Sequence, residues 1–279
     1  MKLLVVTEVF PPTLSASSIV VGKAVKYLLR EGWKVSVLTG RRISLEDPFL
    51  LQDIGQMEAL YEFRHRGYSD YPPLVRLILK NFYGLTPYRG SGLWYRYARE
   101  ALQKILAQET FDVISGVNAL SPAILRLVAE ADTPKTLKVV WYIDPWYISS
   151  QGFRDVVKGF FWRQIEKALL RSFHLIVFSS ESLLKAYQRA LPEMADAFFL
   201  CLQGFDPEDF SGLTGSQVAS PEFRIGYFGS VRPEEIRAIT FLMESLALLP
   251  PEIRSSVEVY IYGWITSTRR ARLQKYFTA

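Results

Sequence analysis

Short apolar runs alternate with amphipathic stretches along most of the chain. Residues Lys2–Thr7 (KLLVVT) form a continuous β-rich run, as expected of a strand that is buried on both faces. After a loop with two prolines, apolar residues recur at helical spacing over 19–29, and Gly32 is a stop signal. Residues 33–39 (WKVSVLT) predict a second strand. This order predicts one right-handed βαβ unit at the start of a parallel sheet.

The same alternation continues to about residue 202. A short helix is predicted over 49–60 and a strand over 61–66. Further strands are predicted at 111–115, 137–143, 174–179 and 197–202, separated by helices at 93–106, 121–131, 153–173 and 180–190. Sustained alternation of this kind predicts an α/β fold with a doubly wound, Rossmann-like parallel sheet.

The pattern is interrupted over 204–221, where glycine, proline and serine are frequent, as in a linker. A new βαβ unit then follows, and a basic helix over 266–277 comes after it. We therefore predict a first domain at 1–205, a linker at 206–221 and a second domain at 222–279. One βαβ unit with a trailing helix cannot bury both faces of a sheet. The second domain is thus expected to be incomplete, either because the chain is a fragment or because another chain supplies the rest.

Composition limits the class of protein. The net charge of +5 favours anionic partners such as phosphate groups, nucleotides or acidic lipid head groups, although a basic surface kept for solubility explains it equally well. The single cysteine, Cys201, excludes an intrachain disulfide, and its apolar neighbours predict a core position. We find no apolar run of transmembrane length and no signal peptide pattern. The expectation is a cytoplasmic protein, possibly peripheral on the inner face of the membrane.

Residues 61–104 differ from the rest because basic residues are interleaved with tyrosine, tryptophan and leucine. Such a composition suits a membrane surface, where aromatic side chains anchor and cations meet anionic lipid. The alternative is a helical excursion whose aromatic residues pack on the sheet. The composition would also suit single-stranded nucleic acid, but we predict no nucleic-acid partner.

Common catalytic motifs are missing from the sequence. It has no Walker lysine loop, no His-Glu-x-x-His, no Gly-x-Ser-x-Gly, no Cys-x-x-Cys and no Asp-x-Asp. With only His65 and His174, a histidine-based metal site or triad is not expected. We predict no metal and no bound cofactor.

Four stretches resemble the nucleotide-sugar glycosyltransferases of the GT-B fold, specifically family 4. They are the opening KLLVVTEVFPP with the later GWKVSVLTG, RSFHLIVFSSES at 171–182, LQGFDPEDF at 202–210, and IGYFGSVRPEEIRAITFLMESLALL at 225–249 followed by VEVYIYG. In LQGFDPEDF, the residues Gly204, Asp206 and Phe210 match that family's interdomain segment. The resemblance implies an acceptor-side first domain and a donor-side second domain. It also implies transfer of a sugar from a nucleotide-sugar co-substrate to a saccharide or lipid-linked acceptor.

The resemblance implies that the first domain binds the acceptor, and its candidate residues lie at the carboxyl ends of strands and in the loops after them, where ligands of open α/β sheets bind. They are Glu8, Ser17, Ser18, Asp144 and Trp146. Ser17 or Ser18 stands where the family has a glycine pair, and it either binds an anion at the helix start or caps the helix. Asp144 either accepts a hydrogen bond from a sugar hydroxyl or forms a turn with Pro145.

Donor-side candidates lie in the loop after the first strand of the second domain. The resemblance implies that Gly229, Arg232 and Arg237 contact the donor diphosphate, since arginine binds phosphate in a bidentate manner. Arg237 is equally well explained as an exposed helix residue. The family's Glu-x7-Glu motif belongs to a region that this sequence lacks. An alternative is therefore a non-catalytic acceptor-binding or membrane-docking module that needs a partner carrying the donor half.

Overall fold

The computed structural model describes residues 1–41, 46–65, 70–84, 92–118, 122–146, 156–212, 223–231, 233–263 and 265–277. The chain forms two compact units, Met1–Asp209 (unit 1) and Phe210–Ala279 (unit 2), which we describe separately. Residues 206–209 of the predicted linker belong to unit 1, and 213–222 lie outside the described residues. The domain limits at 205 and 222 stay a prediction.

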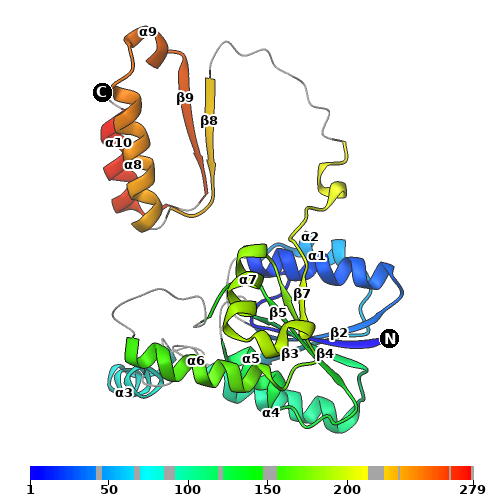
Figure 1. The fold of residues 1–279 in the computed structure, drawn as a ribbon. Helices are drawn as coiled ribbons and strands as arrows, with labels where there is room; N and C mark the ends of the chain where they lie inside the picture. Colours follow the sequence, from blue (N-terminus) through cyan, green and yellow to red (C-terminus); the bar gives the residue numbers. More distant parts are fainter. Residues whose placement is uncertain are drawn as a thin grey trace. The chain divides into compact units, whose positions relative to one another are not determined.

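Unit 1 is built on a parallel sheet in the order β3-β2-β1-β4-β5-β6-β7 (Figure 1). The strands are β1 Lys2–Thr7, β2 Lys34–Arg41, β3 Ala59–Arg64, β4 Val113–Asn118, β5 Leu137–Tyr142, β6 Leu175–Phe178 and β7 Phe198–Leu200. The chain adds β2 and β3 on one side of β1 and the later strands on the other. This reversal confirms the predicted doubly wound α/β fold.

The helices of unit 1 cover both faces of this sheet, apart from α3, which has no described side chain in either core. They are α1 Ala16–Arg30, α2 Pro48–Ile54, α3 Pro73–Gly84, α4 Gly92–Gln108, α5 Pro122–Ala129, α6 Val156–Leu170 and α7 Glu181–Ala190, with short 3₁₀ helices at Pro192–Ala197 (η3) and Pro207–Phe210 (η4). Alternate residues of β1 belong to separate cores: Leu3 and Val5 lie in one cluster with α1 and α2, whereas Leu4 and Val6 lie in the other with α4 to α7. Burial on both faces is why β1 is apolar at nearly every position.

Two expectations about unit 1 are wrong. The helix expected over 49–60 ends at Ile54, because Gly55 follows with a φ of +92°, and residues 59 and 60 belong to β3 instead. Cys201 is exposed rather than buried. It follows β7, which is an edge strand of the sheet, so the apolar run around it is only partly covered.

Unit 2 consists of β8 Phe223–Phe228, α8 Pro233–Ala247, α9 Pro251–Arg254, β9 Val257–Tyr262 and α10 Ser267–Phe277. Its two strands are parallel, and the core formed by Val231, Ile236, Ile239 and Leu273 covers one face. On the strands, Phe228, Tyr260 and Tyr262 remain exposed, and the rings of Phe228 and Tyr262 stack with centroids 4.9 Å apart. Within the described part of unit 2, one face of the sheet thus has no helical cover.

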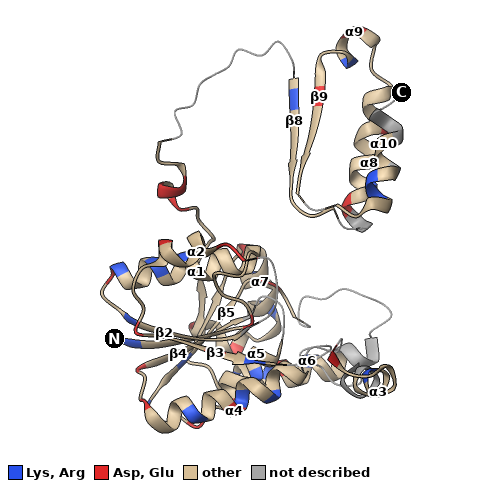
Figure 2. Ribbon diagram, turned by 180° about the vertical axis from the view of Figure 1, so that it is seen from behind, with Lys and Arg blue, Asp and Glu red and all other residues tan. Residues whose placement is uncertain are grey.

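An ion-pair network fastens the residues after β7 to α1 and α2. Lys26 Nζ lies 2.7 Å from both Asp53 Oδ1 and Asp206 Oδ2, and Lys23 Nζ lies 2.6 Å from Asp53 Oδ2 and 2.7 Å from Asp206 Oδ2. Tyr27 donates a hydrogen bond of 2.8 Å to Asp206 Oδ1, and Arg30 contacts Glu208. Figure 2 shows the acidic η4 and the basic positions on α1. The network holds η4 on unit 1.

The network shifts the pKa values of its members. Hydrogen bonds from Lys23 and then Lys26 hold the pKa of Asp206 well below its ordinary value. Burial alone would lower the pKa of Lys26, but hydrogen bonds to Asp206, Asp53 and Glu208 outweigh it and raise that pKa. The pKa of Glu208 falls to about 2 because Arg30 and Lys26 donate to it. Carboxylate oxygens of Asp53, Asp206 and Glu208 lie within 4.8 Å of one another, but Lys23, Lys26 and Arg30 already pair with them.

Replacing Lys26 by methionine tests the network. The side chain of Lys26 is only 1% exposed. The Lys26→Met variant removes one of the two lysines that pair with the buried carboxylate of Asp206 and leaves Lys23 as the other. Removing one member of a buried pair is strongly destabilising, and with Lys23 in place we expect a loss of about 2–3 kcal/mol in the free energy of unfolding, measured in urea. The control Lys34→Met removes an exposed pair with Glu58 and should change this free energy by less than about 1 kcal/mol. Equal losses in the two variants would contradict the assignment.

The lowered pKa of Asp206 predicts a pH dependence of stability. The stabilisation is complete above the ordinary pKa of 3.8 and is lost as the pH falls below it towards the lowered pKa of the folded state. Between pH 6 and pH 3, the urea midpoint of the Asp206→Asn variant should therefore fall less than that of the wild type. The exposed Asp196→Asn variant should keep the wild-type slope. A wild-type slope in Asp206→Asn would refute the prediction.

Candidate functional site

The order of strand addition reverses between β1 and β4, and ligands of open α/β sheets bind at the carboxyl ends of the strands at such a switch point. The helix after β1 lies on one face of the sheet and the helix after β4 on the other, so their loops diverge at this point. Glu8 follows β1 directly and is 5% exposed. The hydroxyl of Thr7 donates a hydrogen bond of 2.9 Å to the carbonyl of Val9, which fixes the turn. The sheet thus places the predicted residue Glu8 at this switch point.

Three serines begin α1, and their roles differ. Ser15 is the N-cap: its side chain accepts a hydrogen bond of 3.2 Å from the backbone N–H of Ser18. Capping by Ser17 or Ser18, one of the two sequence interpretations, is therefore wrong. Ser18 is fully buried, and among the described residues its hydroxyl has no hydrogen-bond partner. Ser17 is partly exposed, so it is the better placed of the two for a ligand.

The loop between β1 and α1 packs tightly on that helix. A Cβ atom at Gly22 would lie 2.8 Å from Pro11 Cγ and 3.2 Å from Ile54 Cδ1. Only glycine allows this approach without displacement of a proline ring. The peptide bond between Pro11 and Pro12 is cis. The position of Glu8 and the serines therefore depends on contacts between the loop, α1 and α2.

Asp144 and Trp146 follow β5, which is separated from β1 by β4 alone. Neighbouring strands are about 4.8 Å apart, so Glu8 and Asp144 begin loops about 10 Å apart at the same edge of the sheet. Asp144 has an exposed side chain, yet nearby protein atoms displace part of its water and raise its pKa. Trp146 is partly buried against the core cluster of α4 to α7. Their contact with an acceptor stays a prediction.

In unit 2, glycines follow both strands. Gly229 and Gly263 each have a φ of +145°, and the N–H of Gly229 donates a hydrogen bond of 2.9 Å to the carbonyl of Tyr262. A Cβ atom at Gly263 would lie 2.2 Å from Gly229 O, which no side chain can tolerate without backbone movement. These glycines bring the carboxyl ends of β8 and β9 together.

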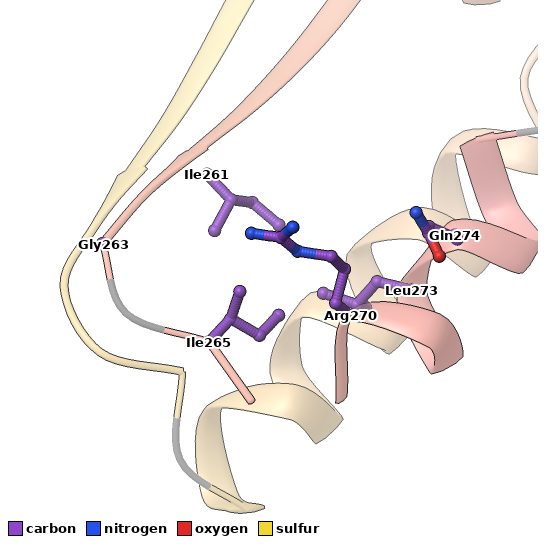
Figure 3. A pocket seen from close by; sticks show the side chains of 6 residues that line it. All are labelled: Ile261, Gly263, Ile265, Arg270, Leu273 and Gln274. Carbon is purple, nitrogen blue, oxygen red and sulfur yellow. The ribbon is translucent and has the colours of Figure 1, made fainter. Parts of the chain in front are cut away.

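A pocket of about 190 Å³ lies beside the end of β9. Figure 3 shows its lining residues, Ile261, Gly263, Ile265, Arg270, Leu273 and Gln274, with the guanidinium group of Arg270 directed toward Ile261. The neighbouring Arg269 donates a hydrogen bond of 2.7 Å to the carbonyl of Val231, which ties α10 to the loop after Gly229. Arg270 therefore adds a cation to the donor-side candidates.

Neither of the two arginines that the sequence suggests for the donor side, Arg232 and Arg237, is among the described residues that line this pocket. Arg237 is exposed on α8, and Arg232 lies outside the described residues. Arg270 was overlooked, although a basic run after Gly263 and a predicted strand is a usable signal for an anion site.

Comparison with known proteins rests on structure. No family model matches the sequence, and no curated protein sequence is significantly similar to it. A sucrose-phosphate synthase from Thermosynechococcus elongatus matches 99% of the chain with a TM-score of 0.65 at 15% identity. WaaG, a glycosyltransferase involved in lipopolysaccharide biosynthesis, matches 99% with a TM-score of 0.60 at 12% identity. The catalytic domain of starch synthase IV from Arabidopsis thaliana matches 98% with a TM-score of 0.61 at 10% identity.

The chain has a GT-B-type fold. It spans 68% of the synthase, 67% of WaaG and 71% of the starch synthase domain. The predicted resemblance to GT-B glycosyltransferases of the family 4 type is confirmed at the level of the fold. At 10–15% identity the matches concern architecture, and activity has to be argued from the residues.

Replacing Gly263 tests the close approach of the carboxyl ends of β8 and β9 in this GT-B-type chain. We expect Gly263→Ala to destabilise unit 2 by about 2 kcal/mol or more, because the methyl group meets backbone and the residue has a positive φ. Urea unfolding followed by tyrosine fluorescence measures the loss. Gly204→Ala is the control, since a Cβ atom there meets no atom within 4 Å. A wild-type unfolding curve for Gly263→Ala would contradict the geometry.

Proposed function

We propose that the chain acts in glycosyl transfer from a nucleotide-sugar to a saccharide or lipid-linked acceptor, with unit 1 on the acceptor side and unit 2 on the donor side. The observation that carries the proposal is the match of 98–99% of the chain, both units included, to GT-B enzymes. The starch synthase structure contains ADP and acarbose, and a UGT2 from Phytolacca americana that matches 96% of the chain with a TM-score of 0.54 contains UDP-2-fluoro-glucose.

On the acceptor side, the proposal assigns hydrogen bonding of sugar hydroxyls to Glu8 and Asp144. Carboxylates accept hydrogen bonds from hydroxyl groups, and both residues begin loops at the same edge of the sheet. Ser17 and Ser18 stand at the start of α1, whose first turn carries no acidic residue and therefore favours an anion. Trp146 would offer a ring face to the sugar.

On the donor side, the leaving group is a nucleoside diphosphate, so negative charge develops as the sugar departs. Gly229, Arg232 and Arg237 are the sequence candidates, and Arg270 joins them because it lines the pocket at the end of β9. Guanidinium groups bind phosphate oxygens in pairs and stabilise the charge that forms in the transition state.

Nucleotide-sugar binding by this chain alone tests the proposal. Calorimetry with UDP-, GDP- and ADP-sugars should find at least one donor that binds with a Kd between about 1 μM and 1 mM. Arg270→Ala should weaken that binding about tenfold or more, because a hydrogen bond between charged groups is lost. Arg254→Ala, an exposed arginine on α9, should leave the affinity unchanged. Glu8→Gln should keep donor binding and lose sugar transfer.

A second candidate is an acceptor-binding module that needs a partner carrying the donor half. The exposed aromatic residues on one face of the β8–β9 sheet favour it, because a Rossmann-like sheet normally buries both faces. Calorimetry with nucleotide-sugars also distinguishes this module from the glycosyl-transfer proposal. Absence of binding for every nucleotide-sugar would contradict the first proposal and support the module, whereas tight binding would exclude a donor site that is incomplete.

A further inference from the structure

Helix α6 carries a buried carboxylate. This helix, like every other that the structure describes, is not long and apolar enough to cross a membrane. Its residue Glu166 is fully buried, and Glu166 Oε1 accepts hydrogen bonds from the hydroxyl groups of Tyr142, at 2.9 Å, and of Tyr187. Both tyrosines are fully buried too, and their ring centroids lie 5.1 Å apart. Burying a carboxylate is costly even when donors compensate it, which points to a role beyond packing.

The hydroxyl group of Tyr187 connects the buried carboxylate to the segment after β5. Because this hydroxyl donates its proton to Glu166, its lone pairs remain to accept a hydrogen bond. Burial is the main cause of the raised pKa of Tyr187, whereas a hydrogen bond from the backbone of Trp146 acts in the opposite direction, as an N–H donor does. Hydrogen bonds thus run from α6 through α7 to the backbone of Trp146.

A second hydrogen bond holds the same segment on the other side of Asp144. The hydroxyl group of Ser179, which follows β6, donates to the carbonyl of Ile143 at 3.0 Å. Asp144 lies between the two anchored residues, and its side chain is exposed to solvent. Residues 143–146 are therefore held by their backbone at both ends, while the carboxylate between them faces outward.

We propose that Tyr187 is a positioning residue of the acceptor side. Held by Glu166, it fixes the backbone of Trp146 and thereby the place at which Asp144 presents its carboxylate. The inference rests on the proposed function, which assigns a sugar acceptor to Asp144 and Trp146. A segment that is held in one conformation before the sugar arrives loses less conformational freedom on binding, so its contacts contribute more to affinity.

Two phenylalanine variants isolate this role. Tyr187→Phe and Tyr142→Phe each remove one hydrogen bond to the same oxygen of Glu166, but Tyr187→Phe also removes the acceptor of the Trp146 N–H. Amide exchange of Trp146 should become about tenfold faster or more in Tyr187→Phe, because a hydrogen bond is lost. In Tyr142→Phe it should stay within about threefold of the wild type, since the hydroxyl group of Tyr187 remains.

The exchange is measured by NMR on full-length protein that is isotope-labelled in its tryptophans, and Trp146→Phe assigns the signal. Far-ultraviolet circular dichroism of both tyrosine variants should match the wild type, because each keeps its aromatic ring in the core.

Steady-state transfer gives the functional readout. The acceptor probe is n-octyl β-D-glucoside, a soluble glycoside with an alkyl chain. Tyr187→Phe should raise the KM for this probe about tenfold and leave the donor Kd unchanged, since the donor-side candidates lie in unit 2. Tyr142→Phe should keep both constants. A general loss of stability would instead affect the two variants alike and would change donor binding as well.

Two results would overturn the proposal. One is equal acceleration of Trp146 exchange in the two tyrosine variants, and the other is an unchanged acceptor KM in Tyr187→Phe. Failure of the proposed function would look different: the wild type would transfer no sugar, while the difference in exchange between the two variants would persist.

Discussion

A parallel sheet needs apolar cover on both of its faces, and much of this chain follows from that constraint. In β1, Leu3 and Val5 pack under α1 and α2, while Leu4 and Val6 pack under α4 to α7. Covering both faces forces the chain to reverse its direction of strand addition at β1. The reversal places Glu8 at the switch point of the sheet, where ligands of open α/β folds bind. In unit 2 the same requirement is met on one face, and the aromatic side chains of Phe228, Tyr260 and Tyr262 remain exposed.

The ion pairs of Lys26 join parts of the chain that are far apart in sequence. Lys26 is almost completely buried, and such a charge is tolerated only because Asp53 and Asp206 lie 2.7 Å away. Asp206 is far from Lys26 in sequence, so the pair ties the chain leaving β7 to α1, the helix that follows β1. The residues that lead toward unit 2 are thereby fixed to the element that holds the acceptor-side candidates. We infer that the acidic residues of the segment GFDPEDF serve to bind the basic residues of α1.

Local sequence patterns predicted the fold well because strand burial and helix periodicity are local properties. They failed where the outcome depends on distant residues. The apolar neighbours of Cys201 resemble a core strand, but only the strand order reveals that β7 is at the edge. Three serines lie at the start of α1, and composition alone does not tell which one caps it. The partnership of Lys26 and Asp206 joins residues 180 positions apart, so no local window contains both. Arg270 became a candidate only when α10 was seen to line the pocket beside Gly263.

Amide hydrogen exchange with and without a nucleotide-sugar tests the central claim most directly. If the chain contributes to glycosyl transfer as a GT-B-type protein with unit 2 on the donor side, a bound nucleotide-sugar will slow exchange in residues 229–231 and 265–274, beside the ends of β8 and β9. Exchange unchanged throughout unit 2 at saturating concentrations of UDP-, GDP- and ADP-sugars would contradict the account.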